Sequence, residues 1–453
     1  MAAGGLSLSA ALARDPAFTG AQLRSALPLP PPFRVPLPIP AVLAPVDTSG
    51  GVDRYEITQR EAVAQILPGV TTPLWTYGGT FPGPTIESRR GRPVTVTHRN
   101  ELPVPTVVHL HGGRTPAASD GYPTDLVLPD GDHGHGAAHG MHDPRAVVTR
   151  LTRDYTFPLD QRPTLLWYHD HRMDFTAPAI WRGLAGLHVV RDDAEDDLGL
   201  PSGPRELPLM IADRAFAADG GFAYPSLDPG LHERPGVAEA YLAGVLGDVI
   251  LVNGAPWPVH EVDAARHRLR LLNASNARHY ELEAVADDGR VLDLVQVGAD
   301  QGLLDAPVTH RALPIAPAER YDVVVDFSGV PVGGLVRLVN RLGSGRTRDV
   351  MAFRVARRAA DDSRVPATLA TDLPAWSRSD AVRVRDFPFR AGRAHGGRGW
   401  LIGGLPFDPA RTDVTTGLGD VEVWRLVADV HHPVHLHLVG FRVLSRGGRP
   451  PRP

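Results

Sequence analysis

The sequence contains no cysteine and no lysine, and only five of its 453 residues are methionine. Without cysteine, the chain can form no disulfide, no thiolate zinc site and no thiol nucleophile. Cysteine usage therefore does not indicate whether the protein works in an oxidising or a reducing compartment. All 47 basic residues are arginine, which we attribute to a nucleotide-composition bias of the source. The lack of cysteine therefore removes several classes of site before any motif is considered.

Long apolar runs and a strong net charge are also missing. No run approaches the roughly 20 apolar residues of a membrane span, and the formal net charge of −4 gives no attraction to nucleic acid or anionic lipid. The weak apolar patch at residues 6–13 has no basic segment or twin arginine before it, so we expect no signal peptide. We expect no nucleic-acid or membrane partner, and a location in the cytoplasm or in a structure packaged from it.

What the sequence does contain is a long series of short β-type segments. A chain of 453 residues exceeds one hydrophobic core and predicts two to four domains. Residues 1–45 end in a proline-dense stretch, which we expect to form an extended arm. The segments after it are rich in β-branched and aromatic residues and are separated by turn signals, whereas helical periodicity is scarce. Examples are residues 94–98, 107–111, 165–169 and 187–190.

Three β-rich blocks in succession predict an all-β protein built from consecutive sandwiches. We place them at residues 46–197, 198–358 and 376–453, with a polar linker at residues 359–375. The third block is shorter than the roughly 100 residues of an immunoglobulin-like sandwich. We therefore expect it to be incomplete at its C-terminus.

Histidine recurs in pairs of the form His-x-His. With 20 histidines in 453 residues, composition alone predicts roughly one such pair, yet four occur. Alternate residues of a strand point to the same face, about 7 Å apart at Cα, so two imidazoles can each hold a different metal ion of a compact cluster. Imidazole suits copper, zinc, iron and nickel alike, so one pair names no metal.

The four pairs differ in their surroundings. One of them, His133/His135, lies in a glycine-rich stretch, where we expect a solvated loop with at most auxiliary metal binding. The other three lie beside apolar or aromatic β-type residues. They are His109/His111, His169/His171 and His435/His437. Six buried imidazoles without a ligand would leave many polar groups unsatisfied, so these three pairs predict one shared metal cluster.

These three pairs lie in segments that resemble the copper motifs of the multicopper oxidases. The segments are His109-Leu110-His111-Gly112-Gly113, Trp167-Tyr168-His169-Asp170-His171 and His432-Pro433-Val434-His435-Leu436-His437. Three more are similar to the bacterial spore-coat laccase and bilirubin oxidase branch. They are Phe81-Pro82-Gly83-Pro84-Thr85-Ile86-Glu87, Ile250-Leu251-Val252-Asn253-Gly254 and Ala316-Pro317-Ala318-Glu319-Arg320-Tyr321-Asp322. The resemblance covers about residue 35 to the end and implies three cupredoxin-like Greek-key sandwiches.

The resemblance implies a type 1 copper that takes electrons from substrate and a cluster of type 2 and binuclear type 3 copper that reduces O2. It assigns His109 and His435 to type 2 copper and His432 to type 1 copper. It assigns four histidines to type 3 copper: His111, His169, His171 and His437. Asp120 matches an acidic residue that helps to deliver protons in the family, although an Asp before Gly is also typical of a turn. Because O2 reduction consumes protons, a carboxylate beside the cluster suits such a relay.

One family motif has no counterpart in the 453 residues: the His-Cys-His run that supplies the type 1 thiolate, a second type 1 histidine and two type 3 imidazoles. A blue-copper site needs this thiolate, and the same cysteine connects substrate oxidation to O2 reduction in the family. We therefore expect a fragment or a shortened gene product with little or no oxidase activity. The full enzyme would oxidise phenols, aromatic amines or bilirubin-like tetrapyrroles, with O2 as acceptor.

Two other functions stay open. The absent cysteine favours a non-catalytic cupredoxin scaffold that serves as an interaction protein, whereas seven retained ligand histidines argue against it. A cuprous oxidase for copper tolerance is the other, but such enzymes carry methionine-rich inserts and this chain has only five methionines. Copper content separates an oxidase from a scaffold. The oligomeric state and the physiological reductant are not predicted by the sequence.

Overall fold

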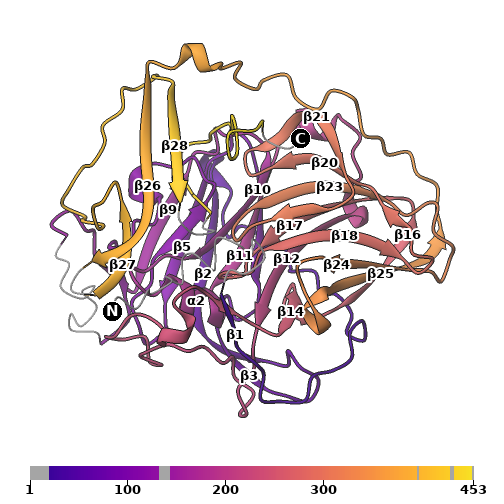
Figure 1. Ribbon diagram of the computed structural model, residues 1–453, viewed down its shortest axis with the longest axis horizontal. Helices are drawn as coiled ribbons and strands as arrows, with labels where there is room; N and C mark the ends of the chain where they lie inside the picture. The colour runs from indigo at the N-terminus through magenta and orange to yellow at the C-terminus, as the bar shows by residue number, and fades with distance from the viewer. Residues whose placement is uncertain (1–19, 132–142, 395–396, 429–432, 451–453) are drawn as a thin grey trace, which may run out of the picture. The chain divides into compact units, whose positions relative to one another are not determined.

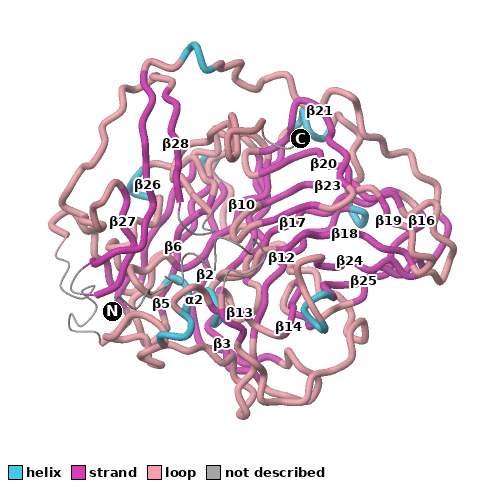
Figure 2. The backbone as a smooth tube through the Cα atoms, in the orientation of Figure 1, coloured by secondary structure: helices cyan, strands magenta, loops and turns pink. Residues whose placement is uncertain are grey.

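The computed structural model consists largely of β-strands, which confirms the all-β prediction (Figures 1 and 2). It describes residues 20–131, 143–394, 397–428 and 433–450. The chain forms two units. The larger comprises Gly20–Gly136, Val147–Thr371 and His435–Pro453, and the smaller comprises Met1–Thr19, Ala137–Ala146 and Asp372–Val434. The predicted division into three domains stays a prediction.

Two four-stranded sheets form a first sandwich within the larger unit. One sheet has the order β3-β2-β5-β9 and the other the order β4-β11-β10-β6. Their bounds are β2 Asp53–Ala64, β3 Thr72–Tyr77, β4 Gly83–Arg89, β5 Val94–Asn100, β6 Val108–His111, β9 Thr152–Phe157, β10 Thr164–Asp170 and β11 Ala185–Arg191. Side chains from both sheets share one core, with Ile57 and Val96 from the first and Leu110 and Leu166 from the second.

A second sandwich of the larger unit combines a seven-stranded sheet with a six-stranded one. The first has the order β15-β14-β12-β17-β23-β20-β21, and the second has the order β16-β25-β24-β18-β19 with β22 also paired to β18. The first sheet comprises β12 Glu206–Arg214, β14 Val249–Val252, β15 Ala255–Pro256, β17 Arg266–Asn273, β20 Leu294–Ala299, β21 Gly302–His310 and β23 Arg320–Asp326. The second comprises β16 Val259–Ala264, β18 Tyr280–Ala286, β19 Val291–Leu292, β22 Leu313–Ile315, β24 Leu335–Asn340 and β25 Asp349–Arg358.

Strand β10 is buried on both faces, which explains its nearly continuous apolar sequence. On one face, Leu166 and Tyr168 belong to the core of the first sandwich. On the other, Leu165 and Trp167 pack with Met210 of β12 in a separate cluster. The strand is therefore held between the two sandwiches, and side chains at its end have firmly fixed positions.

The proline-rich residues 20–45 run as an extended arm along the larger unit. The Leu37 backbone N–H donates to the Val259 carbonyl at 2.9 Å, and the Leu43 N–H donates to the Thr85 carbonyl at 2.8 Å. The arm thus contacts β16 of the second sandwich and β4 of the first. After the last strand of the second sandwich, Leu369 packs into a small apolar cluster with Leu200, Val297, Leu303 and Val324.

The smaller unit contains one three-stranded sheet with the order β27-β26-β28. It comprises β26 Arg383–Ala394, β27 Gly397–Ile402 and β28 Glu422–Ala428. The pair β26 and β27 is antiparallel, whereas β26 and β28 are parallel. Ile402 and Val427 are exposed.

The remaining elements are short. The strands are β1 Ala21–Gln22 paired with β13 Val245–Leu246, and β7 Val127–Leu128 paired with β8 Thr149–Arg150. The α-helices are α2 Thr176–Arg182 and α3 Asp193–Asp196. The 3-10 helices are η1 Ser49–Gly51, η2 Ala117–Ser119, η3 Gly203–Arg205, η4 Glu239–Tyr241, η5 Gly345–Arg348 and η6 Arg378–Asp380. Among the described residues, no helix has the length and apolar character needed to cross a membrane.

Candidate metal centre

The pairing of β6 with β10 brings two of the histidine pairs together. His109 lies directly opposite His169, and His111 lies directly opposite Trp167. Residues that face each other across an antiparallel pair point to the same side of the sheet. The rings of His109 and His169 are 5.4 Å apart between centroids, and those of His109 and His111 are 5.6 Å apart. Three of the predicted ligands therefore converge through strand register alone.

His171 lies just beyond β10, yet it joins the same group. Its backbone N–H donates to the Val107 carbonyl at 2.9 Å, which continues the contact between the two chain segments past the end of the strand pair. Its ring lies 5.2 Å from that of His109 and 5.7 Å from that of His169. The second pair thus contributes both of its imidazoles.

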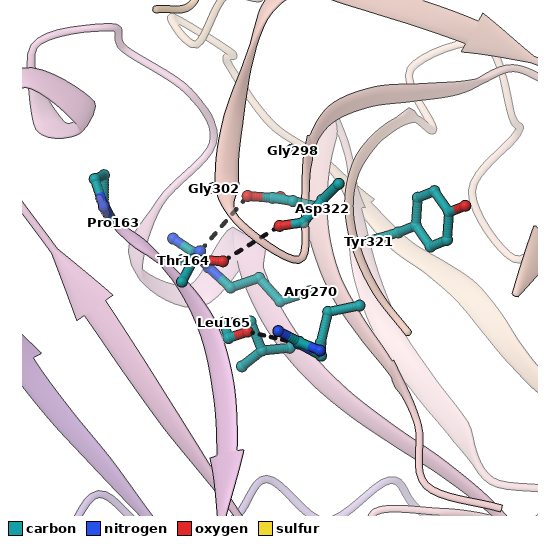
Figure 3. A pocket seen from close by; sticks show the side chains of 10 residues that line it. Pro163, Thr164, Leu165, Arg270, Gly298, Gly302, Tyr321 and Asp322 are labelled. Atoms are coloured by element: carbon teal, nitrogen blue, oxygen red, sulfur yellow. Dashed lines mark hydrogen bonds and ion pairs between the residues drawn. The ribbon is translucent and has the colours of Figure 1, made fainter. Parts of the chain in front are cut away.

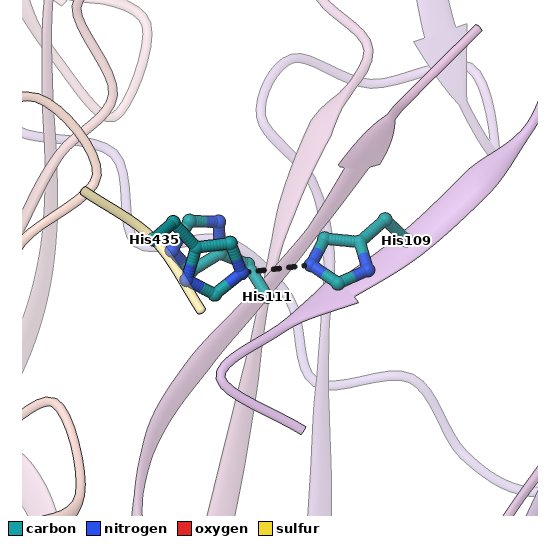
Figure 4. A group of neighbouring side chains, drawn as sticks. All are labelled: His109, His111 and His435. Carbon is teal, nitrogen blue, oxygen red and sulfur yellow. Dashed lines mark hydrogen bonds between the residues drawn. The ribbon is translucent and has the colours of Figure 1, made fainter. Parts of the chain in front are cut away.

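The C-terminal segment brings the third pair to the same place, and Figure 4 shows one of its members, His435, with His109 and His111. His435 stacks on His111 with centroids 3.6 Å apart, and its Nε2 lies 3.2 Å from Nε2 of His109. His437 stacks on His109 at 4.1 Å. One ligand nitrogen from each of His109, His111 and His435 lies within 4.8 Å of the other two. Residues more than 300 positions apart in the sequence therefore present their imidazoles to one another.

Hydrogen bonds orient several of these rings. Nδ1 of His109 donates to the Asp120 carbonyl, Nδ1 of His169 donates to the Asp170 carbonyl at 2.8 Å, and Nδ1 of His437 donates to the Asp120 carboxylate at 2.9 Å. Because each of these Nδ1 atoms carries the proton, each Nε2 keeps a free lone pair. Histidines that bind metals are commonly oriented in this way.

The charge state of the imidazoles also suits metal binding. His109, His111 and His169 are 1%, 6% and 4% exposed. Burial lowers the pKa of all three, and it lowers the pKa of His171 to about 3. A metal ligand must be the neutral imidazole. Nε2 of His169 and Nδ1 of His171 are buried without a hydrogen-bond partner, so the donor set fits a metal for which imidazole is a good ligand, such as copper.

Asp120 connects two parts of this cluster. Its Oδ2 accepts a hydrogen bond from His437, and its Oδ1 lies 3.3 Å from Nδ1 of His109. Burial acts to raise the pKa of Asp120, but the hydrogen bonds from these two histidines outweigh it and hold that pKa below its ordinary value. Asp120 also precedes Gly121, which has a φ of +76°, so it ends a turn as well as contacting the cluster.

A buried arginine approaches the cluster from the second sandwich. Arg320, at the start of β23, donates from Nε to the Leu165 carbonyl at 3.1 Å and is 3% exposed. Figure 3 shows the surroundings of this contact, where Thr164 and Leu165 of β10 meet the second sandwich. A Cβ built on Gly112, whose φ is +84°, would lie 2.3 Å from Nη2 of Arg320. Glycine after His111 therefore leaves room for the guanidinium.

The structure brings together six of the seven histidines predicted as ligands, and it places Asp120 beside them. His432 and the pair His133/His135 lie outside the described residues. Sequence reasoning did not single out Trp167, whose ring lies 4.1 Å from that of His169, or Arg320. The sequence contained an indication of both residues. Trp167 is two residues before His169 in a strand and so points to the same face, and Arg320 lies in the Ala316–Asp322 segment that resembles the family.

The comparisons with known proteins agree with this geometry. Family models described as multicopper oxidase match residues 58–195 and 374–453. A laccase of Bacillus stratosphericus is 37% identical over 90% of this chain and 83% of its own length. A bilirubin oxidase of Albifimbria verrucaria is 34% identical over 92% of this chain and 71% of its own.

Solved structures show the same relationship. The 2F4 variant of the McoA multicopper oxidase from Aquifex aeolicus has a TM-score of 0.74 and 26% identity, with 93% of this chain and 87% of that chain covered. Together with the sequence relatives, this likeness extends over most of the described sheets. The chain belongs to the multicopper oxidases of the laccase-like branch, which are copper-dependent oxidoreductases that use O2.

Proposed function

We propose that the six clustered histidines hold the copper ions at which O2 is reduced. His109 and His435 would be the type 2 ligands. The type 3 ligands would be His111, His169, His171 and His437. The observation that carries this proposal is the approach of Nε2 of His435 to within 3.2 Å of Nε2 of His109. Two imidazole nitrogens this close to each other can bind one ion when both are unprotonated.

A titration of the folded chain with Cu(II) tests this assignment. We expect tight binding that the variant His435→Ala weakens. A folded chain that binds no Cu(II) would overturn the copper assignment and would favour the alternative, a non-catalytic cupredoxin scaffold. That alternative has one specific observation behind it, the absence of cysteine from the 453 residues.

Copper, when bound, supplies the one-electron chemistry that connects oxidation of a reductant to reduction of O2. The chain's own residues orient the ligands and exclude water from most of them. Asp120 holds the ring of His437 through Nδ1 and lies beside His109. We assign Asp120 the delivery of protons to this site, because its carboxylate is the acidic group in contact with two of the ligand candidates.

The proposed reductants are phenols, aromatic amines or bilirubin-like tetrapyrroles. The relatives named as laccase and bilirubin oxidase support this class of substrate. His432 would bind the type 1 copper that accepts their electrons. A blue-copper site also needs a thiolate, and the 453 residues contain no cysteine. We therefore propose that this chain alone has little or no oxidase activity.

An assay of the 453-residue chain, loaded with copper, on a phenolic substrate tests this second point. We expect bound copper without substantial turnover. Robust oxidation of the phenol would overturn the proposed need for a thiolate. Turnover of Cu(I) in preference to the phenol would instead indicate a cuprous oxidase, which the five methionines do not favour.

We also propose that the two sandwiches are the first two of three cupredoxin-like domains, at residues 46–197 and 198–358, followed by a linker at 359–375 and a third domain from residue 376. Most buried residues of the first core precede residue 198 and most of the second follow it, which supports the first boundary. The exceptions are Ile66, Leu67 and Leu74, which pack into the second core together with Leu37 of the arm, and Leu231, which packs into the first. The location in the cell, cytoplasmic or in a spore coat, stays a prediction.

A further inference from the structure

Asp170 lies between two candidate ligands, His169 and His171, but its side chain does not belong to the cluster. Alternation along β10 points it to the same side as Tyr168, into the core of the first sandwich. It is 1% exposed. A buried carboxylate is costly unless its oxygens accept hydrogen bonds, so the partners of Asp170 show what it does.

Both partners are backbone amides, one on each of the two chain segments that meet beyond the β6–β10 pair. The Val107 N–H donates to Oδ1 and the Arg172 N–H donates to Oδ2, each at 3.1 Å. Val107 precedes β6 and its carbonyl accepts the N–H of His171 at 2.9 Å. The Asp170 side chain and the His171 backbone therefore form two adjacent links between the segment before β6 and the residues after β10.

This arrangement matters most for His171. His109, His111 and His169 lie within the paired strands β6 and β10, whereas His171 lies beyond the last residue pair, Asp170 with Val108. The segment after it is anchored separately, because Arg172 Nη1 donates to the Leu231 carbonyl at 2.7 Å. His171 thus lies between the end of the β6–β10 pair and the hydrogen bond from Arg172 to Leu231. There the carboxylate of Asp170 connects the segment before β6 to the segment after β10.

We propose that Asp170 is a positioning residue that sets the place of His171 in the metal centre, an inference that rests on the proposed function. An aspartate can accept both amide hydrogen bonds, one on each oxygen. An asparagine of the same shape offers one acceptor oxygen and turns an NH2 group toward the other N–H. Asp170→Asn would therefore leave either the Val107 N–H or the Arg172 N–H buried without an acceptor, and the connection between the two segments would be lost on that side.

Asp361, which follows β25, offers a control. Asp361 also accepts two backbone amides on its two oxygens, from Arg266 at 2.9 Å and from Ser363 at 3.0 Å. None of these residues contacts the histidine cluster. The substitution Asp361→Asn therefore removes one amide acceptor away from the metal centre, as Asp170→Asn does within it, and it also weakens the ion pairs of Asp361 with Arg205 and Arg266.

The experiment uses the full chain, with Cu(II) alone as the probe and a chelator as competitor, at a temperature where all variants are folded. We expect Asp170→Asn to weaken Cu(II) binding about tenfold or more, as loss of a group that orients a ligand typically does. We also expect it to change the Cu(II) electron paramagnetic resonance spectrum. Asp361→Asn should leave both unchanged, although it too lowers the unfolding temperature.

Wild-type affinity and spectrum in Asp170→Asn would overturn the proposal, and so would equal weakening in Asp361→Asn. A wild-type chain that binds no Cu(II) would instead overturn the proposed function on which it rests. If Asp170→Asn does not fold, amide hydrogen exchange of the metal-free wild-type chain tests whether the two hydrogen bonds to Asp170 hold the segments together. Slow exchange of the Val107 and Arg172 amides is expected, and fast exchange of both would contradict this connection.

Discussion

The two parts of the histidine cluster are held by different kinds of structure. The strand-borne histidines, His109, His111 and His169, lie on paired strands and are almost completely buried, and His171 follows directly after β10. The C-terminal histidines, His435 and His437, lie on a segment without strands among its described residues; His435 is exposed, and the side chain of His437 is 30% exposed. The same chemical group is thus presented once by a sheet and once by a loop.

This difference teaches which part of the site exists before metal arrives. Strand pairing and burial fix the strand-borne rings, because moving one would break the register and the packing around β10. The C-terminal rings are held by stacking on His109 and His111 and by the Asp120 carboxylate. Metal binding contributes to folding where a site is not preformed. We expect a bound ion to order the C-terminal segment far more than the strands.

The largest effect should follow from removing the histidine that joins the two parts. The His109 ring lies beside the other five. His109→Ala should weaken Cu(II) binding by more than the roughly 10–100-fold typical of groups that merely orient a ligand. Competition with a chelator measures this. His232→Ala, an exposed histidine elsewhere, is the control, and unchanged affinity in His109→Ala would contradict the central role.

A second prediction addresses the support of the strands. Arg320 donates to the carbonyls of Leu165, Ala318 and Asp300 from within the protein. Arg320→Met would leave these acceptors without their donor, which costs about 1–3 kcal/mol of unfolding free energy. Denaturant unfolding of the metal-free chain measures it. Arg320→Lys should recover only part of the loss, because an ammonium lacks the planar fork, and full recovery would show that charge alone suffices.

The fold could be predicted from the sequence where the signal was local. Residues 165–169 and 187–190 were predicted as β-type segments and lie within β10 and β11. Asn253-Gly254, a dipeptide typical of hairpin turns, is a turn with positive φ at both residues, 49° and 84°, between β14 and β15. Local composition sufficed because β-branched runs and Asn-Gly turns act over a few residues.

The site could be predicted only in part. The spacing of His109 and His111 indicated a shared face, but it contained no information on which strand lies opposite. The approach of Arg320 to Gly112 and of Asp120 to His437 depends on chain segments far apart in the sequence. Such contacts follow from sheet register and sandwich packing, which no short sequence window encodes. A resemblance to a family supplied what local pattern could not.

The third prediction concerns Asp120, the side chain that the two parts of the cluster share. Asp120→Asn keeps one acceptor oxygen and loses the carboxylate charge. Its contact with His437 should weaken, and Cu(II) affinity should fall about tenfold, at the lower end for groups that orient a ligand. Hydrogen exchange should then quicken in residues 433–450 but not in β6 or β10. Equal quickening in both would show that the two parts are not held separately.

The smallest effect should come from the surface of the C-terminal segment. Arg446 lies 3.8 Å from Glu319 in an ion pair, and its side chain is 71% exposed. Only the arginine is exposed, since the Glu319 side chain is 24% exposed, but at this distance a pair that reaches the solvent contributes about 1 kcal/mol, and salt screens it. Arg446→Ala should therefore leave Cu(II) affinity unchanged at high salt and lower it only slightly at low salt. A large loss at both would mean that this pair, rather than the stacking and Asp120, holds the C-terminal histidines in place.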